Sequence, residues 1–336
     1  MAVGLDCGTS FYISSRADLI KKQRNAFLTL DGDPGVIKRM LSRKDIPYVE
    51  RNNRMHIVGQ YAFDYAQIFS GAELKRPMKD GLLNPGERDS LPVLKAIIEE
   101  LLGKPESENE ICVYCVPSKP IDRETLVNYH EDALSNLIES LGYKSVSVEE
   151  SVALAYEGLA DHDLTGIAIS MGAGMCNLCV MYAGMPAVTF SVARGGDFID
   201  EHAGLDTGVS KAKAQYVKES SNLNIFRQTD GMYEDDTEQS NIQSALRSYY
   251  GVLIRYLLGN LRKQFEHADN IPNFQDPVPL VLGGGTAMVE GFVDFFKVQL
   301  EKEGLPINIS DVILVENPHT AVSRGCLADA LIEESN

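Results

Sequence analysis

The chain has 336 residues, which is too long for one ordinary hydrophobic core and is typical of two domains. Its 31 Lys and Arg against 48 Asp and Glu give a net charge of -17, which opposes direct binding to nucleic acid or anionic lipid. No run approaches the roughly 20 apolar residues that cross a bilayer, and the first residues do not resemble a signal peptide. We therefore expect a cytoplasmic protein with no direct membrane anchor.

Two segments about half a chain apart share the pattern of a hydrophobic strand, a glycine turn and a second strand. They are Val3–Ser10 and Ile167–Gly174. Each strand places a polar residue near its end, Asp6 in the first copy and Ser170 in the second. Because glycines let backbone N–H groups approach a ligand closely, phosphate is the natural candidate. The second copy predicts the start of a second lobe.

The elements between and after these copies alternate in α/β order. A strand at about 110–116 precedes a helix at about 122–141, a short strand near Val146 and a helix opened by Glu149-Glu150-Ser151. A helical period predicts one long helix over 239–267.

A buried strand at 279–282 ends in Gly283-Gly284-Gly285-Thr286 and leads to a helix containing Phe292. Strand, glycine turn and helix N-terminus suggest a third cradle for phosphate or nucleoside. A glycine turn at a strand end is more often plain turn geometry. The order of the three turns is more specific, because it is typical of duplicated-lobe nucleotide phosphotransferases.

Two CxxC pairs, Cys112/Cys115 and Cys176/Cys179, have the spacing of a four-thiolate zinc site. Both pairs fall in apolar runs that we interpret as strands, where residues three apart point to opposite faces. One strand would not present both thiolates to one ion. Buried structural thiols are therefore favoured over zinc.

Six motifs in order resemble those of the actin-like ATPases, and most closely their prokaryotic MreB/MamK-like branch. The resemblance covers nearly the whole chain. GLDCGTS and SMGAGMCN resemble the two phosphate loops, and LVLGGGTAMVEGF resembles the adenosine motif. The other three motifs are RPMKDG at 76–81, VEESVA at 148–153 and ENPHTAVSRG at 316–325.

The resemblance implies an α/β actin-like ATPase fold with two duplicated lobes, a small subdomain inserted in each, and nucleotide in the central cleft. The brief first insertion favours a bacterial or archaeal protein. The expected boundaries are 1–29, 75–150 and 317–336 for the first core, 30–74 for its insertion, 151–193 and 255–316 for the second core, and 194–254 for its insertion.

The first phosphate loop is expected to hold magnesium and phosphate. The Asp6 carboxylate would hold Mg²⁺ through retained waters, while Gly8, Thr9 and Ser10 would bind phosphate oxygens. The alternative for Asp6 is an Asx turn, which Asp before glycine often makes.

Glu150 aligns with the catalytic position of the family and would orient the attacking water. The alternative is an acid that complements the helix dipole, a role that suits its neighbour Glu149.

The remaining nucleotide contacts are also implied by the resemblance. Gly283, Gly284, Gly285 and Thr286 would lie against the nucleotide, with adenine beside Met288. In the charged helix at 212–219, Lys218 and Glu219 would contact purine and ribose, although charged helix faces are usually only solvated. Gly195 and Gly196 of the GGDxxD segment would close on phosphate, and Asp197 could equally cap a helix.

The second phosphate loop departs from the family pattern. It normally begins with Asp and carries Thr and Asp after the glycines, where this chain has Ser170, Met175 and Asn177. Binding through the amides of Gly172, Ala173 and Gly174 should survive, whereas hydrolysis is expected to be slow. On this reasoning Ser170→Asp should raise turnover.

The leading functional prediction is a filament-forming ATPase that polymerises with ATP and hydrolyses it to ADP and phosphate. Its partners would be further copies of itself and a cargo or adaptor that the sequence does not identify. The alternatives are a small-molecule kinase of the same superfamily, which needs a polar substrate cluster, and a chaperone-like ATPase switch, which needs a substrate-binding domain.

Overall fold

The computed structural model divides the chain into two compact units. The first comprises Met1–Val116, Leu126–Val148 and Cys326–Asn336, and the second comprises Pro117–Thr125 and Glu149–Gly325. The structure describes residues 2–68, 73–84, 86–125, 127–220, 223–226, 238–267 and 271–335. Parts of the two predicted insertions, at 69–72, 221–222 and 227–237, lie outside the described residues.

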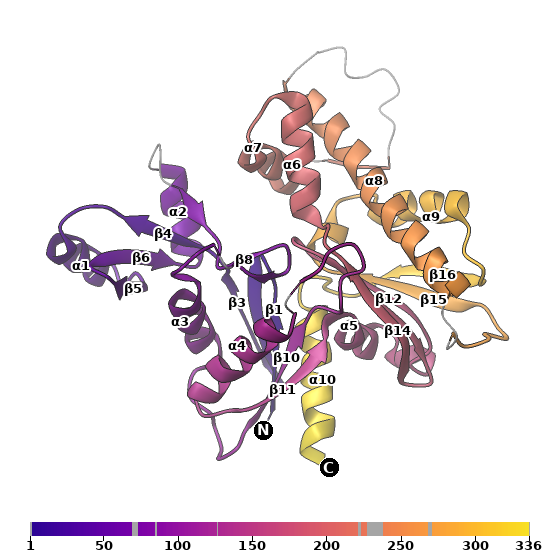
Figure 1. Cartoon of the computed structure of the whole chain (residues 1–336), viewed down its shortest axis with the longest axis horizontal. Helices are drawn as coiled ribbons and strands as arrows, with labels where there is room; N and C mark the ends of the chain where they lie inside the picture. Colours follow the sequence, from indigo (N-terminus) through magenta and orange to yellow (C-terminus); the bar gives the residue numbers. More distant parts are fainter. Residues whose placement is uncertain are drawn as a thin grey trace. The chain divides into compact units, whose positions relative to one another are not determined.

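A five-stranded sheet in the order β11-β10-β1-β2-β3 forms the core of the first unit (Figure 1). β1 pairs in parallel with β10 and antiparallel with β2. All six residues of β10 are buried, as expected for the apolar run of a central strand. The strands are Ala2–Cys7 (β1), Phe11–Arg16 (β2), Leu19–Arg24 (β3), Ile111–Val116 (β10) and Lys144–Glu149 (β11).

The second unit repeats this topology in the order β16-β15-β12-β13-β14. β12 pairs in parallel with β15 and antiparallel with β13, as β1 does with β10 and β2. The predicted internal duplication is therefore present in the sheets. These strands are Gly166–Met171 (β12), Cys176–Tyr182 (β13), Met185–Val192 (β14), Val278–Gly283 (β15) and Ile309–Leu314 (β16).

A smaller sheet, β5-β6-β4-β7, adds its own apolar cluster to the first unit. Helix α1 begins with Pro34 and is capped by Asp33, whose carboxylate accepts from the Val36 N–H at 2.9 Å. The remaining strands are Phe27–Leu30 (β4), Tyr48–Arg51 (β5), Arg54–Val58 (β6), Leu74–Lys75 (β7), Met78–Lys79 (β8) and Leu82–Leu83 (β9). The helices are Pro34–Arg43 (α1), Gln60–Ile68 (α2), Ser90–Leu102 (α3) and Val127–Ser140 (α4), and Ala321–Ser335 (α10) crosses the boundary between units.

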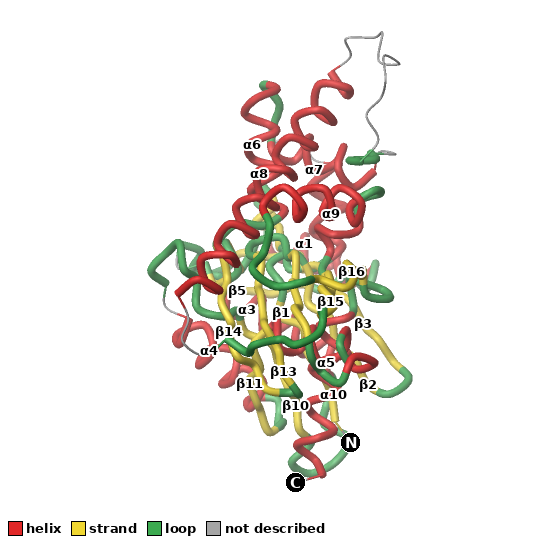
Figure 2. Tube along the Cα trace, turned by 90° about the vertical axis from the view of Figure 1, so that its right-hand side faces the viewer, coloured by secondary structure: helices red, strands yellow, loops and turns green. Residues whose placement is uncertain are grey.

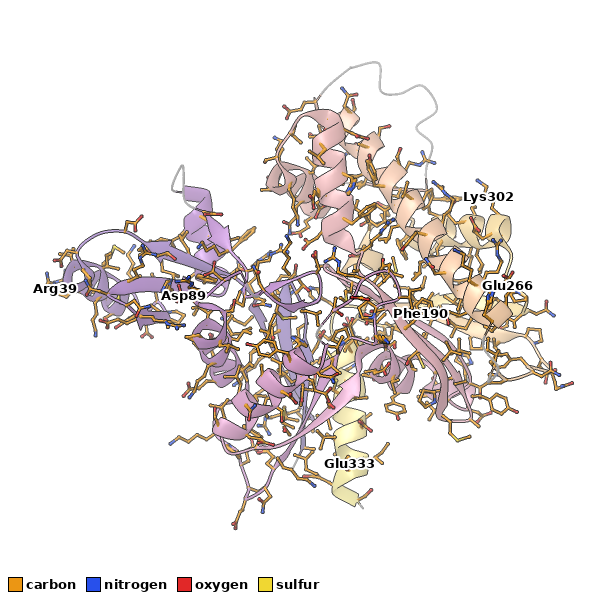
Figure 3. The ribbon with its side chains drawn as sticks, in the orientation of Figure 1. Arg39, Asp89, Phe190, Glu266, Lys302 and Glu333 are labelled. Atoms are coloured by element: carbon orange, nitrogen blue, oxygen red, sulfur yellow. The ribbon has the colours of Figure 1, made fainter. Side chains whose placement is uncertain are left out.

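Helices α6 and α7 of the second unit lie together with the first part of α8 beyond the ends of its strands, and α8 then runs down beside the sheet (Figure 1, Figure 2). The long α8 buries residues at helical spacing, which confirms the period seen in the sequence. Phe190 lies in the interior of this unit, whereas Glu266 and Lys302 extend outward (Figure 3). The helices are Glu150–Gly158 (α5), Gly196–Thr207 (α6), Lys211–Ser220 (α7), Glu238–His267 (α8) and Phe292–Glu303 (α9), with 3₁₀ turns at Ala160–His162 (η1) and Gly285–Met288 (η2).

One predicted helix start is wrong, and a second predicted helix, which does contain Phe292, begins away from its glycine turn. Helix α4 begins at Val127 rather than near 122, because the preceding loop pairs with β14 and the Asp122 carboxylate accepts from the Ala193 N–H at 2.9 Å. The glycine turn after β15 leads into η2, and α9 begins only at Phe292. Gly291, at φ 77°, separates the two helices, so α9 does not place its N-terminus at the glycine turn.

All six cysteines are buried free thiols, and the two CxxC pairs lie in strands of separate sheets. Burial raises the pKa of the Cys112 and Cys176 thiols, and it raises the pKa of Cys179 to about 12. At Cys115, by contrast, hydrogen bonds with Cys326 and Cys7 lower the pKa of the thiol. Because the two pairs belong to separate sheets, neither strand supplies four thiolates, and Cys112, Cys176 and Cys179 pack as small buried thiols. Over the described part of the chain, no helix is both long and apolar enough to span a membrane.

Candidate functional site

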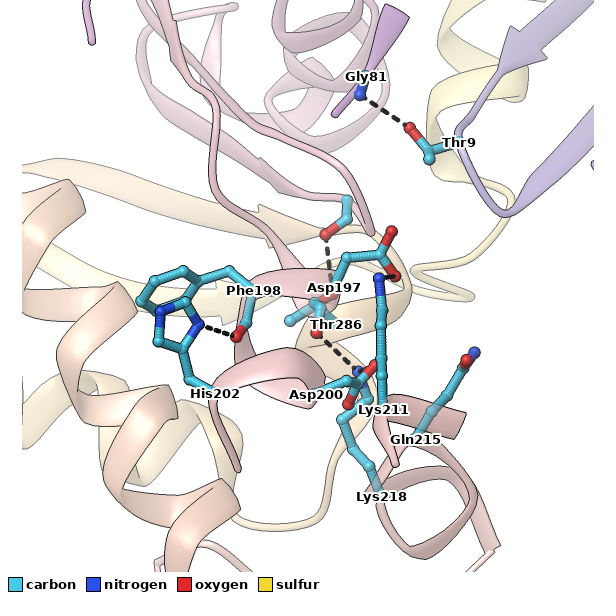
Figure 4. Close-up of polar contacts among 12 residues, drawn as sticks. Thr9, Gly81, Asp197, Phe198, Asp200, His202, Lys211, Gln215, Lys218 and Thr286 are labelled. Atoms are coloured by element: carbon cyan, nitrogen blue, oxygen red, sulfur yellow. Dashed lines mark hydrogen bonds and ion pairs between the residues drawn. The ribbon is translucent and has the colours of Figure 1, made fainter. Parts of the chain in front are cut away.

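The first hairpin joins β1 to β2 and carries Asp6 and Thr9. The half-buried Asp6 carboxylate accepts from the Cys115 thiol at 3.4 Å. The Thr9 hydroxyl accepts from the Gly81 N–H at 3.1 Å, which joins the RPMKDG motif to this turn (Figure 4). A Cβ at Gly8 would lie 2.6 Å from the Phe11 carbonyl oxygen. Glycine is therefore required by the turn itself, whether or not it contacts a ligand.

Asn25, which the sequence analysis did not single out, braces this turn. Its side-chain N–H donates to the Gly8 carbonyl at 3.0 Å, and its backbone N–H donates to the Ser10 carbonyl at 3.0 Å. Asn25 is fully buried. No motif marks it, because the contact forms only when β3 has folded back onto the hairpin.

The second hairpin joins β12 to β13 with the same backbone constraint. A Cβ at Gly172 would lie 2.8 Å from the Met175 carbonyl oxygen, which already accepts the Gly172 N–H at 3.0 Å. The spacing from glycine to carbonyl is three residues in both hairpins. Ser170 and Asn177 face each other across the strands, and both are buried.

The Glu150 carboxylate, on the first residue of α5, is held by these two side chains. The Ser170 hydroxyl donates to Oε1 at 2.6 Å and the Asn177 amide donates to Oε2 at 2.9 Å. The Asn177 side-chain oxygen accepts from the Ser118 N–H at 3.1 Å. Two of the three departures from the family pattern, Ser170 and Asn177, therefore contact the predicted catalytic acid.

The neighbouring Glu149 has a different environment. Its carboxylate accepts from the Ser118 hydroxyl, which also lies 3.3 Å from the Ser151 hydroxyl. Glu149 is the N-cap residue of α5 but makes no side-chain capping bond. The two adjacent acids therefore have different hydrogen-bond partners: Ser118 for Glu149, and Ser170 and Asn177 for Glu150. The sequence does not mark Ser118, because it lies in a loop between Pro117 and Pro120 and belongs to none of the motifs.

Gly195 and Gly196 pack the start of α6 against the second hairpin. The Gly196 and Asp197 N–H groups donate to the carbonyls of Gly172 and Ala173, at 3.0 and 2.8 Å. A Cβ at Gly195 would lie 2.5 Å from both carbonyl oxygens. This packing accounts for the two glycines without a phosphate, and their contact with phosphate stays a prediction. Gly174, in the turn of the second hairpin, is buried.

Lys218 is engaged by a buried acid that was not predicted. Its ammonium donates to the Asp200 carboxylate at 2.8 Å and to the Gly196 carbonyl at 3.2 Å (Figure 4). Asp200 is 1% exposed, and burial raises its pKa to about 6 against the opposing effect of Lys218. Glu219 is exposed and accepts from Gln215 at 2.7 Å. Lys218 therefore supports the start of α6, and a nucleoside contact by either residue stays a prediction.

The glycine turn after β15 contains three different environments. Gly283 packs against Leu154, and Gly284, at φ +86°, would place a Cβ 2.5 Å from the Met171 carbonyl oxygen. The exposed Gly285 would place a Cβ in open space. Of the three glycines, Gly285 is therefore the one whose surroundings leave room for a ligand.

Thr286 and Met288 follow in η2. The Thr286 hydroxyl donates to the Gly172 carbonyl at 2.9 Å, and its own carbonyl accepts from the Tyr250 hydroxyl at 3.2 Å. The Met288 side chain is 52% exposed. Thr286 thus ties the glycine turn to the second hairpin, whereas Met288 presents an apolar surface beside it.

The carboxylate at the first hairpin, Asp6, fits a Mg²⁺ ion that is bound through its retained water molecules. Among the described residues there is no cluster of three His, Cys, Asp or Glu that could hold a metal ion. Mg²⁺ keeps several waters and is usually bound through one or two carboxylates and the substrate phosphates. The Asp6 carboxylate, at the end of β1 beside a glycine turn, meets that smaller requirement.

Two duplicated sheets, each with a glycine hairpin between its first two strands, define the class of protein. The fold is that of the actin-like proteins of the MreB/MamK type. Over 98% of both chains, the structure matches one described as a MamK double helical filament, with a TM-score of 0.75 and 17% identity.

MreB5 of Spiroplasma citri bound to ADP matches with a TM-score of 0.67 and 14% identity over 99% of this chain and 96% of that one. The same protein bound to AMPPNP matches with a TM-score of 0.68 and 14% identity over 99% and 98%.

A family profile described as Volactin matches residues 1–330, and the chain belongs to the volactin family. No curated protein matches the sequence.

Proposed function

We propose that this chain is an ATP-dependent filament-forming protein that binds ATP with Mg²⁺ and hydrolyses it to ADP and phosphate. The observation that carries the proposal is the pair of hairpins with equivalent glycines, each beside a carboxylate: Asp6 by the first, Glu150 by the second. The fold is shared with a MamK filament and with MreB5 bound to ADP and to AMPPNP. The subunits would associate with copies of themselves.

The proposed roles follow from the chemistry of each group. Amides of the first hairpin at Gly8 and of the second at Ala173 and Gly174 bind phosphate oxygens, since the Gly172 N–H already donates to the Met175 carbonyl, and Asp6 would hold the waters of the cation. Bound Mg²⁺ would neutralise charge on the phosphates. Glu150 orients the attacking water, and Gly285 with Met288 lines the nucleoside side. The chain would act in the cytoplasm of a prokaryote, and its cargo or adaptor is not assigned.

Electron microscopy and phosphate release on the purified chain, with and without ATP and Mg²⁺, test the proposal. We expect filaments that require ATP, and phosphate release that requires Mg²⁺. Filaments formed equally with and without nucleotide would contradict the ATP dependence. ATP-dependent phosphate transfer to a small molecule, with no filaments across salt conditions, would favour the kinase alternative.

Gly285→Val tests the nucleotide site more cleanly than Gly284→Val. A side chain at Gly284 would overlap the Met171 backbone and disturb folding, whereas one at Gly285 would enter open space. Calorimetry should show weaker ATP binding for Gly285→Val at an unchanged unfolding temperature. Gly259→Val is the matched control, since a Cβ there also meets nothing, its φ is not in the left-handed region, and it lies in α8 away from the glycine turn. Equal ATP affinity in both variants would remove Gly285 from the site.

A further inference from the structure

We propose that Ser170 and Asn177 are positioning residues. Their hydrogen bonds to both oxygens of the Glu150 carboxylate fix it in the orientation in which it aligns the attacking water. The inference rests on the proposed ATPase function and specifies how its second hairpin operates. The three residues lie on three elements, β12, β13 and α5, and their side chains meet in one place.

The geometry makes this contact a two-point clamp. Ser170 donates to Oε1 at 2.6 Å and Asn177 donates to Oε2 at 2.9 Å. Hydrogen bonds to an ionised group are shorter and stronger than neutral ones. Two donors on different oxygens fix the plane of the carboxylate as well as its position. A water molecule that is hydrogen-bonded to that carboxylate would therefore also have a fixed position and direction of attack.

The orientation of the Asn177 amide is set by its second partner. Its oxygen accepts from the Ser118 N–H at 3.1 Å, which leaves its NH₂ group to face Glu150. Ser170 and Asn177 are 1% and 0% exposed, so water does not readily replace either donor. The clamp is therefore part of the folded core of the second unit.

The same geometry gives both neutral residues a role in this chain, although the family pattern has acids at these positions. A carboxylate at position 170 or 177 would be within contact distance of the Glu150 carboxylate, and two adjacent acids do not both ionise easily. A neutral hydroxyl and a neutral amide stabilise the ionised Glu150 instead. Ser170→Asp should therefore lower turnover, which is the opposite of the result expected from the sequence alone.

Phosphate release and ATP affinity, measured on matched variants of the full chain, test the clamp. Ser170→Ala and Asn177→Ala should each lower kcat about tenfold, the equivalent of about 1.4 kcal/mol, at unchanged ATP affinity by calorimetry. Ser170→Thr keeps the hydroxyl and should restore most of the rate.

The control is Ser14→Ala, since Ser14 is also buried and donates to the Leu101 carbonyl at 3.3 Å rather than to any group that contacts Glu150. It should be destabilised yet retain normal turnover. Equal loss of turnover in Ser170→Ala and Ser14→Ala, or a faster Ser170→Asp, would overturn the clamp.

A double-mutant cycle between Ser170→Ala and Glu150→Ala in urea unfolding, without nucleotide, separates the clamp from the proposed function. We expect non-additive effects, with a coupling of about tenfold in the unfolding constant. Additive effects would refute the clamp even in an active ATPase. Clear coupling in a chain that binds no ATP would instead refute the proposed function.

Discussion

The two hairpins have one backbone and two sets of side chains. In each, a glycine three residues before a carbonyl leaves no room for a Cβ, at 2.6 Å in the first hairpin and 2.8 Å in the second. The first carries an acid of its own, Asp6, beside a thiol, whereas the second carries Ser170, which donates to an acid on a helix. Duplication of the fold therefore preserved the turn, while the position of the carboxylate changed.

The hairpins also differ in what supports them. Asn25 supports the first through the Gly8 carbonyl. The equivalent carbonyl of Gly172 accepts from both the Gly196 N–H and the Thr286 hydroxyl. The second hairpin is thus bound to α6, and α6 is held in turn by the buried ion pair of Asp200 and Lys218. The second hairpin thus has a charged support, the ion pair of Asp200 and Lys218, whereas the first has a neutral support, the hydrogen bond from the Asn25 amide.

The largest effect should come from breaking that charged support. Lys218→Met leaves the buried Asp200 carboxylate without its counter-charge and should lower the free energy of unfolding by about 3–5 kcal/mol at neutral pH. The double variant Asp200→Asn/Lys218→Met removes both charges and should recover much of the loss. Urea unfolding at neutral pH measures both. If the double variant were no more stable than the single one, packing rather than charge would hold α6.

Next in size is the acid of the first hairpin. Asp6→Asn keeps the shape of the side chain and removes its charge, so Mg²⁺ should bind more weakly and turnover should fall about 100-fold. A Mg²⁺ titration of phosphate release measures the change. Cys115→Ala removes the thiol that donates to Asp6 and serves as the control, with a small effect expected. A larger loss in Ser170→Ala than in Asp6→Asn would reverse the proposed roles of the two hairpins.

The charged support should also respond to pH. Because burial raises the pKa of Asp200 from 3.8 to about 6, the folded chain holds a proton there that the unfolded chain releases. Between about pH 4 and 6 this residue's contribution to the free energy of unfolding should fall as pH rises, by up to about 1.4 kcal/mol per pH unit. Urea unfolding at several pH values should show this slope reduced in Asp200→Asn/Lys218→Met. An identical pH profile in both proteins would contradict it.

The smallest effects concern the neutral supports. Asn25→Ala should cost about 1–2 kcal/mol of unfolding free energy, because a buried side-chain donor to the Gly8 carbonyl is lost. Thr286→Val is nearly isosteric and should cost about 0.5–1 kcal/mol, since the Gly172 carbonyl keeps the Gly196 N–H. Thermal unfolding of the two variants compares the supports directly. A Thr286→Val variant less stable than Asn25→Ala would show that the threonine, not α6, carries the second hairpin.

Local sequence patterns determined much of this molecule. Glycine turns after apolar strands located both hairpins, and helical periodicity located α8, because these signals depend on residues close together in the chain. The order of the motifs predicted the actin-like fold, which the structural matches confirm. The predicted start of α4 was wrong and α9 begins away from its glycine turn, since pairing with β14 and the conformation of Gly291 override local propensity.

The tertiary structure decided which side chains meet. Ser170 is 20 residues from Glu150, and Lys218 is 18 from Asp200, on different elements in each case. From the sequence Ser170 was a missing acid and Lys218 a predicted nucleoside contact, which stays a prediction. The fold adds that Ser170 donates to Glu150 and that Lys218 pairs with a buried carboxylate. Local patterns determine how a strand or helix forms, but a hydrogen bond between elements depends on how they pack, and that depends on the whole core.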